Sequence, residues 1–449
     1  MSRRGVSSWS SLDARPTLVR QRPASVRNFW VPSDRCGTVS RTGPASDDGG
    51  GAVDYSGQRG LFGLSTLTAI DLFCGCGGLS CGFSQEGFGV RLGADMRQTA
   101  LDAFKKNFPD ALTLNADLSE LEPTALLDAL GMMEGELDCL YGGPPCQGFS
   151  KNVVASRRSL EDPRNRLILR FLEFVSSLRP KFVLIENVAE MKNAYGEAYT
   201  SQIIEIFEEL GYEATSFRLN AADFGVPQLR RRAFFLANRL GIHMDRPQPS
   251  HLASSKSPDL FNCLTAENHV TAWEAISDLP SLGSGEGTSP CAYGAEPQND
   301  YQREMRRGSQ QVEDHVARDL KSRQLERVMH LEPGMGQGVE TLPDHLKPKS
   351  GYSGAYARLR PDEPARTITR WVFHPGSGRF YHPYDYRVIT IREAARLQSF
   401  PDRYHFSGSY NDKASQIGES VPPLMARAIA MEVRAALERH RQAEPTPAS

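Results

Sequence analysis

The first half of the chain alternates short apolar runs with amphipathic stretches. Five apolar segments have the length and composition of buried strands: 66–73, 90–95, 111–117, 136–143 and 181–187. Apolar residues at helical spacing predict five intervening helices: 78–88, 99–108, 123–133, 166–178 and 201–211. Strands separated by helices of this length predict a parallel sheet with helices on both faces.

The pattern changes in the second half of the chain. Segments 213–220 and 231–238 have only a turn segment between them, which predicts an antiparallel hairpin that closes the sheet. Clusters of Pro, Ser, Gly and Asn then dominate, and two short helices are expected among them: 271–279 and 315–329. Helical spacing returns in two later segments: 390–400 and 422–440. We expect the last of these helices to pack back on the first domain.

These patterns predict an α/β protein of two domains with disordered tails. The first domain, a doubly wound Rossmann-like sheet, comprises 66–240 and 356–440, and a second, smaller, irregular domain comprises 241–355. Tails are expected at 1–65 and 441–449. The N-terminal tail carries nine Arg and five Asp. It could contact nucleic acid weakly or act as a transit peptide, but an inert leader is the simpler interpretation.

Composition narrows the class of protein. With 449 residues, 39% hydrophobic and 24% charged, the chain is too long for one small core and too apolar to be wholly disordered. It lacks an apolar run long enough for a membrane helix or a signal core, and its eight Cys include no CxxC pair. We therefore expect a cytoplasmic protein with no membrane segment and no metal site. The net charge of −2 means that any nucleic-acid surface must be local.

The first candidate for chemistry is the turn after the first predicted strand, Asp71 to Gly78, with the sequence DLFCGCGG. Its glycines let the backbone approach a ligand, and the spacing is neither GxGxxG nor a Walker loop. Asp95 and Asp117 end the next two strands, where acids can reach ribose hydroxyls and an adenine amino group. The three strand ends together suggest S-adenosylmethionine, although each Asp could merely cap a helix.

The second candidate is Cys146, which follows two prolines after the fourth predicted strand. The prolines stiffen the turn and would hold the thiol at the carboxyl edge of the sheet. A fixed, partly exposed thiol suits nucleophilic catalysis. A lone Cys is more often buried and inert, but the PPC turn reverses that expectation.

Two further candidates lie on later strands. Glu186 ends the fifth strand, where a carboxyl beside a ring substrate can give and take a proton or can cap a helix. The run Gln228 to Arg232 is typical of one strand whose alternation places Arg230 and Arg232 on the face of Gln228, and Arg231 on the other. The two guanidiniums would face the active-site floor, unless the run is only an edge-strand charge cluster.

Seven motifs follow one another in an order that is similar to that of the DNA (cytosine-5)-methyltransferases: DLFCGCGG, PPCQGFS, ENV, QLRRR, ARTIT, REAARLQSFPDRYHFSGS and QIGESVPP. Over roughly 66–240 and 355–435 the chain resembles a bacterial member of this family. So many ordered motifs are far more specific than a single match.

The resemblance implies roles for individual residues. Cys146 matches the nucleophile that adds to carbon 6 of cytosine, Glu186 the acid at ring nitrogen 3, and Arg232 the group that binds the ring carbonyl. Arg230 remains a catalytic candidate from the alternation of its strand alone. Contacts to S-adenosylmethionine are expected from Asp71, Phe73, Gly75, Gly77, Asp95, Asp117, Pro144 and Glu419. Contacts to the base or the DNA are expected from Pro145, Gln147, Ser150, Arg164, Gln228 and Thr367.

The resemblance also implies partners and leaves alternatives. The substrate would be a cytosine flipped out of double-stranded DNA, read by 241–355 as a target-recognition domain, although the net charge of that segment is −5. A monomer associated with the nucleoid is expected, either in a restriction–modification system with a cognate restriction endonuclease as a further partner or as an orphan methyltransferase. Glu419 departs from the family, which usually has Asn there. The alternatives are a tRNA cytosine-5 methyltransferase and a non-catalytic regulator.

Overall fold

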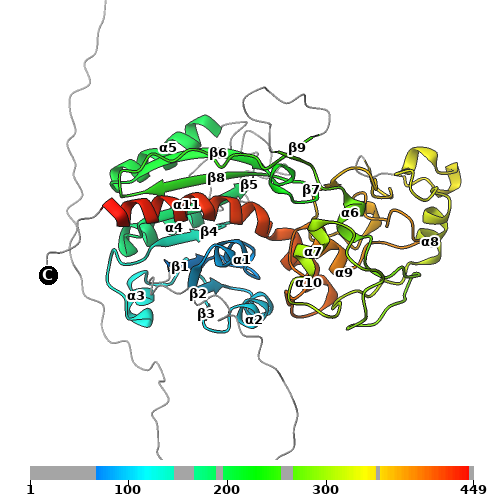
Figure 1. The fold of residues 1–449 in the computed structure, drawn as a ribbon, viewed down its shortest axis with the longest axis horizontal. Coiled ribbons are helices and arrows are strands. Elements are labelled where there is room, and N and C mark those ends of the chain that lie inside the picture. The colour runs from blue at the N-terminus through cyan, green and yellow to red at the C-terminus, as the bar shows by residue number, and fades with distance from the viewer. Residues whose placement is uncertain (1–66, 146–165, 189–195, 254–265, 350–353, 444–449) are drawn as a thin grey trace, which may run out of the picture. The chain divides into compact units, whose positions relative to one another are not determined.

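The computed structural model describes residues 67–145, 166–188, 196–253, 266–349 and 354–443. These residues form a seven-stranded sheet with six mutually parallel strands and one antiparallel strand (Figure 1). In spatial order its strands are β3 (Leu112–Asn115), β2 (Phe88–Asp95), β1 (Leu67–Leu72), β4 (Cys139–Gly142), β5 (Phe182–Val188), β8 (Arg231–Asn238) and β6 (Glu213–Asn220). β8 runs antiparallel to both of its neighbours, β5 and β6. The predicted doubly wound sheet is confirmed, and the predicted hairpin inserts its second strand between β5 and β6.

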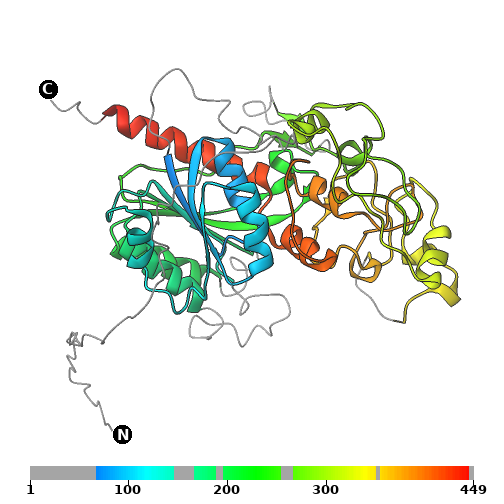
Figure 2. The same ribbon diagram turned by 90° about the horizontal axis from the view of Figure 1, so that it is seen from below.

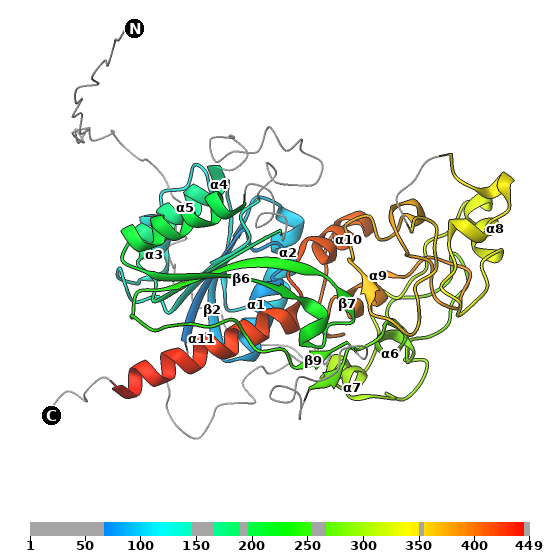
Figure 3. The same ribbon diagram turned by 90° about the horizontal axis from the view of Figure 1, so that it is seen from above.

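Helices cover both faces of the sheet (Figure 3). On one face lie α3 (Thr124–Leu130), α4 (Arg166–Leu178) and α5 (Gly196–Glu209), which pack on apolar residues of β1, β4 and β5. On the other face lie α1 (Gly78–Gln85) and α11 (Pro423–Ala443). The C-terminal helix α11 packs directly against α1 (Figure 2), as the apolar spacing of 422–440 predicts. Helix α2 (Gln98–Asn107) packs beside β2 and β3.

Two sequence predictions about local structure are wrong. The helix expected over 315–329 is only α8 (Ser322–Met329), because His315 is fully buried and contacts Thr390 and Pro280 through its ring nitrogens. The run 228–232 is not one strand. β7 (Gln228–Leu229) leaves the main sheet to pair with β11 (Ala365–Arg366), and the chain breaks at Arg230 before β8 begins.

Between β8 and α11 the chain forms short elements joined by loops, both in 241–355 and in the first part of 356–440. They are β9 (His251–Leu252), β10 (Glu267–Asn268), α6 (Ala272–Ile276), α7 (Asp300–Arg306), α8, α9 (Ile391–Leu397) and α10 (Tyr410–Glu419). One apolar cluster contains residues of α6, α7, α9 and α10, so the late helices share a core with the segment that precedes them. Arg396 of α9 is fully buried and pairs with both Asp278 and Asp402, at 3.0 and 2.6 Å.

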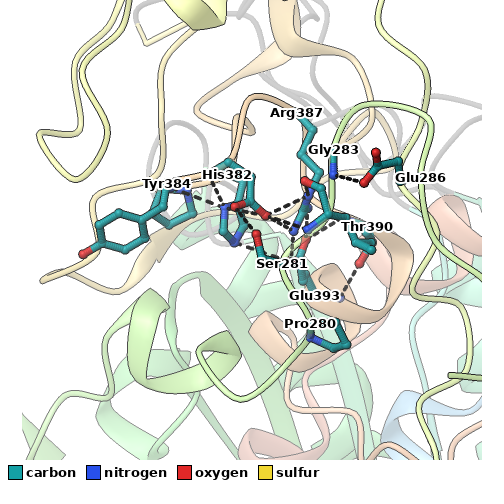
Figure 4. A network of polar contacts seen from close by, with 12 residues as sticks. Pro280, Ser281, Gly283, Glu286, His382, Tyr384, Arg387, Thr390 and Glu393 are labelled. Atoms are coloured by element: carbon teal, nitrogen blue, oxygen red, sulfur yellow. Dashed lines mark hydrogen bonds and ion pairs between the residues drawn. The ribbon is translucent and has the colours of Figure 1, made fainter. Parts of the chain in front are cut away.

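A buried polar network fixes the start of α9 (Figure 4). Arg387 donates two hydrogen bonds of 2.8 Å to the Glu393 carboxylate, and both side chains are essentially inaccessible to solvent. His382 lies 3.6 Å from Glu393, and burial lowers the pKa of His382 to about 4. Ion pairs and hydrogen bonds therefore act together with the apolar cluster to hold the start of α9 in place. Among the residues described, no helix combines the length and hydrophobicity needed to cross a membrane.

Candidate functional site

A cavity of about 440 Å³ lies at the carboxyl ends of the parallel strands. Its walls come from the ends of β1, β2, β4 and β5, from the segment after β3, and from the end of α10. Ligands of open α/β sheets bind at this edge, where the order of strands reverses on either side of β1. Eight of the residues expected at the site line it: Asp71, Phe73, Gly75, Asp95, Asp117, Pro145, Glu186 and Glu419.

The turn after β1 is shaped for close approach of a ligand. Phe73 has a φ of 57°, a left-handed conformation that is costly for a residue with a side chain. Gly75 has a φ of 54°, and a Cβ added there would meet no atom within 4 Å. At Gly78, by contrast, a Cβ would lie 2.4 Å from the carbonyl oxygen of Val421. The turn is therefore open at Gly75 and closely packed at Gly78.

Asp71 is a buried carboxyl with an unused oxygen. Ser80 donates a hydrogen bond of 2.7 Å to its Oδ2, while Oδ1 has no partner among the residues described. Burial raises the pKa of Asp71 to about 8, and the hydrogen bond from Ser80 offsets only part of this shift. A buried acceptor without a partner is costly, and a cationic or hydrogen-bonding ligand in the adjoining cavity could satisfy it.

Asp95 joins the turn after β1 to the start of α2. Its Oδ2 accepts a hydrogen bond of 2.9 Å from the Gly75 amide, and its Oδ1 accepts one of 2.8 Å from the Arg97 amide. The Arg97 side chain extends to Glu419, where Nη1 and Oε2 are 2.7 Å apart. Asp117 is exposed and accepts hydrogen bonds from the amide and hydroxyl of Ser119, which lower its pKa. Asp95 thus has a structural task besides any ligand contact.

Glu186 lines the cavity, and Arg232, which is not among the residues that line it, pairs with Glu186 from the next strand. Glu186 Oε1 and Arg232 Nε are 2.8 Å apart, and the two side chains are 13% and 17% exposed. They come from the paired strands β5 and β8, in which Arg232 lies opposite Val188. The backbone of Gly143 passes directly beside Glu186, because a Cβ added there would lie 3.1 Å from Oε2. A carboxylate and a guanidinium held side by side can bind the donor and acceptor groups of a heterocyclic ring.

The structure corrects the roles expected for Arg230 and Gln228. Arg230 is fully buried and donates hydrogen bonds of 2.9 Å to the carbonyls of Ile368, Gly418 and Ser420. It therefore does not face the floor of the site beside Arg232, because the break after β7 turns its side chain into the interior. Gln228 is also fully buried. Its amide contacts Gln398, the Leu397 carbonyl and the Ile368 amide, so its polar atoms are used within the protein.

Three more expected residues lie outside the cavity wall. Gly77 has a φ of 94° and packs against Phe108 and Tyr404, so its backbone serves a turn rather than the cavity. The Pro144 carbonyl accepts a weak hydrogen bond of 3.5 Å from Asn187, and the Thr367 hydroxyl donates one of 2.9 Å to the Leu229 carbonyl. The remaining four expected residues lie outside the described residues: Cys146, Gln147, Ser150 and Arg164.

The structure also adds residues that the sequence patterns did not indicate. Arg97, Gln416 and Ser420 line the cavity, and Arg370 lies 3.6 Å from Glu419. Arg97 stands two positions after Asp95, and Gln416 and Ser420 flank Glu419 in the motif QIGESVPP. In the sequence, Arg97, Gln416 and Ser420 are indicated only by their closeness to Asp95 and Glu419.

Comparison with known proteins gives consistent matches across most of the chain. Residues 67–435 match the family model of C-5 cytosine-specific DNA methylases. Type II methyltransferase M.AgeI of Thalassovita gelatinovora is 34% identical, over 83% of this chain and 100% of that protein. Type II methyltransferase M1.HphI of Haemophilus parahaemolyticus is also 34% identical, over 82% of this chain and 87% of that protein. A DNA modification methyltransferase encoded within an E. coli prophage has a similar crystal structure, with a TM-score of 0.65 and 26% identity, over 83% of this chain and 100% of that one.

Proposed function

The chain belongs to the C-5 cytosine-specific DNA methylases, and from this premise we propose how it acts as a DNA (cytosine-5-)-methyltransferase. It methylates carbon 5 of a cytosine flipped out of a specific double-stranded DNA sequence, through a transient bond from Cys146 to carbon 6. One observation carries this proposal. The cavity that contains the acids of β1 and β2 also contains Glu186, with Arg232 paired to it at 2.8 Å.

The lining of the cavity fits S-adenosylmethionine. The unused buried oxygen of Asp71 suits an ammonium group, Asp95 and Asp117 suit hydroxyl and amino groups, and the open backbone at Gly75 admits close contact. When bound, the cofactor supplies a methyl group activated by a positively charged sulfur. Asp71, Phe73, Gly75, Asp95 and Glu419 would hold it.

The chain's own residues make carbon 5 reactive. Carbon 5 of cytosine is a poor nucleophile, so the Cys146 thiolate first forms a bond to carbon 6 and pushes electrons into the ring. Glu186 donates a proton or hydrogen bond at ring nitrogen 3, and Arg232 binds the ring carbonyl, so both stabilise the charge that develops. Carbon 5 then takes the methyl group. Loss of the proton from carbon 5 and cleavage of the carbon–sulfur bond release 5-methylcytosine and regenerate the thiolate.

The position of the reacting atoms requires base flipping. Carbon 6 lies within the base stack of a duplex, where a side chain cannot approach it from above the ring. Extrusion costs a few kcal/mol, which contacts in the cavity can offset. Pro145, the residue before Cys146 in the chain, lines the cavity.

We assign target recognition to 241–355 and catalysis to 66–240 and 356–440. In support, α6 and α7 share an apolar core with α9 and α10, and α10 ends at the cavity. The target sequence would thus be read by a region that packs against the cofactor wall. The type II relatives favour a role in restriction–modification. We further propose that the methyltransferase acts as a monomer in the cytoplasm, with a cognate endonuclease as partner of the system.

Transfer of tritium from methyl-labelled cofactor to purified nucleic acid tests the proposal. We expect label in duplex DNA containing the target sequence and none in tRNA. Label in tRNA alone would replace DNA by RNA as the substrate, and label in neither would favour a cofactor-binding regulator. Bisulfite sequencing of plasmid DNA from an expressing host would then identify the target cytosine.

A further inference from the structure

Four charged side chains alternate in sign along the rim of the cofactor cavity. Arg97 lies 3.8 Å from Asp95 and 2.7 Å from Glu419, and Glu419 lies 3.6 Å from Arg370. Asp95, Arg97 and Glu419 line the cavity, whereas Arg370 approaches Glu419 from outside it. The Glu419 carboxylate is thus shared by two guanidiniums, and the charges of the four groups sum to zero.

The fold holds Glu419 at this point. The buried guanidinium of Arg230 donates to the carbonyls of Gly418 and Ser420, the two residues on either side of Glu419. Gly418 packs so closely on the segment before Trp371 that an added Cβ would lie 2.3 Å from the Arg370 amide. The Arg370 guanidinium in turn lies over the Trp371 ring, 4.9 Å from its centroid. Backbone and side-chain contacts therefore fix both partners of Glu419.

Removal of the carboxylate would change the charge of this rim. With Asn or Gln at 419, two guanidiniums would remain with only Asp95 to offset them, and the rim would carry a net charge of about +1. Burial alone would lower the pKa of Arg97, but Glu419 and Asp95 outweigh this effect and raise it, so Arg97 is charged at any working pH. A positive rim opposes the binding of a positive ligand.

We propose that Glu419 makes the cavity selective for the positively charged cofactor over its demethylated product, by offsetting the charges of Arg97 and Arg370. This inference rests on the proposed function and assigns a specificity role to the residue that departs from the family. The cofactor carries a sulfonium, and the thioether product S-adenosylhomocysteine does not, while their remaining groups are the same. A change in rim charge therefore acts on one ligand and barely on the other, so the rim favours the cofactor when it competes with the product for the cavity.

Calorimetric titration of the full chain with each ligand tests the proposal. We expect Glu419→Gln to raise the Kd for S-adenosylmethionine about threefold to tenfold, because the charges are partly exposed and screened, and to change the Kd for S-adenosylhomocysteine less than about twofold. Sinefungin carries an ammonium near the position of the sulfonium, so Glu419→Gln should raise its Kd by a factor similar to that for the cofactor. High salt should reduce the effect of Glu419→Gln on the Kd for S-adenosylmethionine, because it screens the charges.

Two further variants separate charge from contact. Glu419→Asp keeps the carboxylate and should keep the ratio of the two Kd values. Arg370→Gln combined with Glu419→Gln removes one charge of each sign and should restore much of that ratio. Glu363→Gln is the matched control, since it breaks an ion pair of 2.7 Å to Arg360 with similar exposure, 43% and 47%, and should leave both Kd values unchanged.

Three outcomes would overturn the inference. If Glu419→Gln weakens both ligands equally, Glu419 contacts a group they share, such as the amino group, and does not sense the sulfonium. If it weakens neither, or if Glu363→Gln has the same effect, the rim charge plays no part in selectivity. If the unmodified protein binds neither ligand, the proposed function itself fails. A thermal midpoint equal to that of the unmodified protein shows that a variant's change in Kd does not come from misfolding.

Discussion

Two arginines in the motif QLRRR should respond in opposite ways to the same substitution. Arg230 and Arg232 are two positions apart, and the sequence predicts both at the active site. In the structure Arg230 is fully buried among backbone carbonyls, whereas Arg232 pairs with Glu186 at the cavity. We therefore predict that Arg230→Met mainly lowers stability and that Arg232→Met mainly lowers turnover.

The size of each effect follows from the hydrogen bonds that each substitution removes. Arg230→Met leaves the carbonyls of Ile368 and Gly418 without the donor that each had at 2.9 Å, whereas the Ser420 carbonyl keeps a hydrogen bond of 2.8 Å from Gln398. An unsatisfied buried acceptor costs about 1–3 kcal/mol, and the released cost of burying a guanidinium offsets part of the sum. The expected loss is about 3 kcal/mol, or a fall of on the order of 5 °C in the thermal midpoint. Arg232→Met should cost about 1 kcal/mol or less, because water can reach Glu186 from the cavity.

Thermal unfolding and steady-state methylation, measured on both variants, test this pair of predictions. Arg232→Met should reduce kcat by about a hundredfold or more, as expected when a donor to a developing charge is removed. Arg230→Met should retain measurable turnover well below its midpoint. A structural role for Arg230 is contradicted if Arg230→Met unfolds at the same temperature as the unmodified protein. The separate roles of the two arginines are contradicted if Arg232→Met is destabilised as much as Arg230→Met.

Three other predictions concern the nucleophile, the cofactor and the buried polar network at the start of α9. Cys146→Ala should abolish turnover and keep DNA binding in a mobility-shift assay, so methylation above background would refute its role. Asp95→Ala should raise the cofactor Kd about tenfold in calorimetry, because the Gly75 amide also loses its acceptor at 2.9 Å. Burial lowers the pKa of His382 from 6.5 to about 4, so between these pH values the unfolded state binds more protons than the folded state. The free energy of unfolding should therefore fall by up to about 3 kcal/mol as the pH drops from 6.5 to 4. The pKa of Glu393 is also lowered, so the free energy of unfolding should continue to fall below pH 4.5. Urea midpoints measured against pH test this, and in His382→Gln they should change less between pH 6.5 and 4.

Local sequence patterns are sufficient to predict the sheet and the acids at its edge. Buried parallel strands are short apolar runs, and their carboxyl ends meet at one edge, so the sequence alone places Asp71, Asp95 and Glu186 together, and all three line the cavity. β6, β8 and α4 have the predicted bounds, because each has a periodicity of its own.

Long-range partners are beyond the reach of these patterns. Alternation along a strand predicts one face for Arg230 and Arg232, but the break at Arg230 is set by carbonyls 138 to 190 positions away. The motif of glycines does not reveal that Gly75 faces open space and that Gly77 packs on Tyr404. The ion pair of Arg97 with Glu419 joins residues 322 positions apart, and no local pattern encodes it.

The transient bond between Cys146 and carbon 6 of the target cytosine is the central claim, and covalent trapping tests it most directly. Duplex oligonucleotides with 5-fluorocytosine at the methylated position should arrest the reaction after methyl transfer, since fluorine cannot leave as a proton does. Incubated with cofactor, the unmodified protein should form a denaturation-resistant complex with this DNA, and Cys146→Ala should not. An enzyme that methylates the normal duplex and never becomes attached to the fluorinated one would contradict the account.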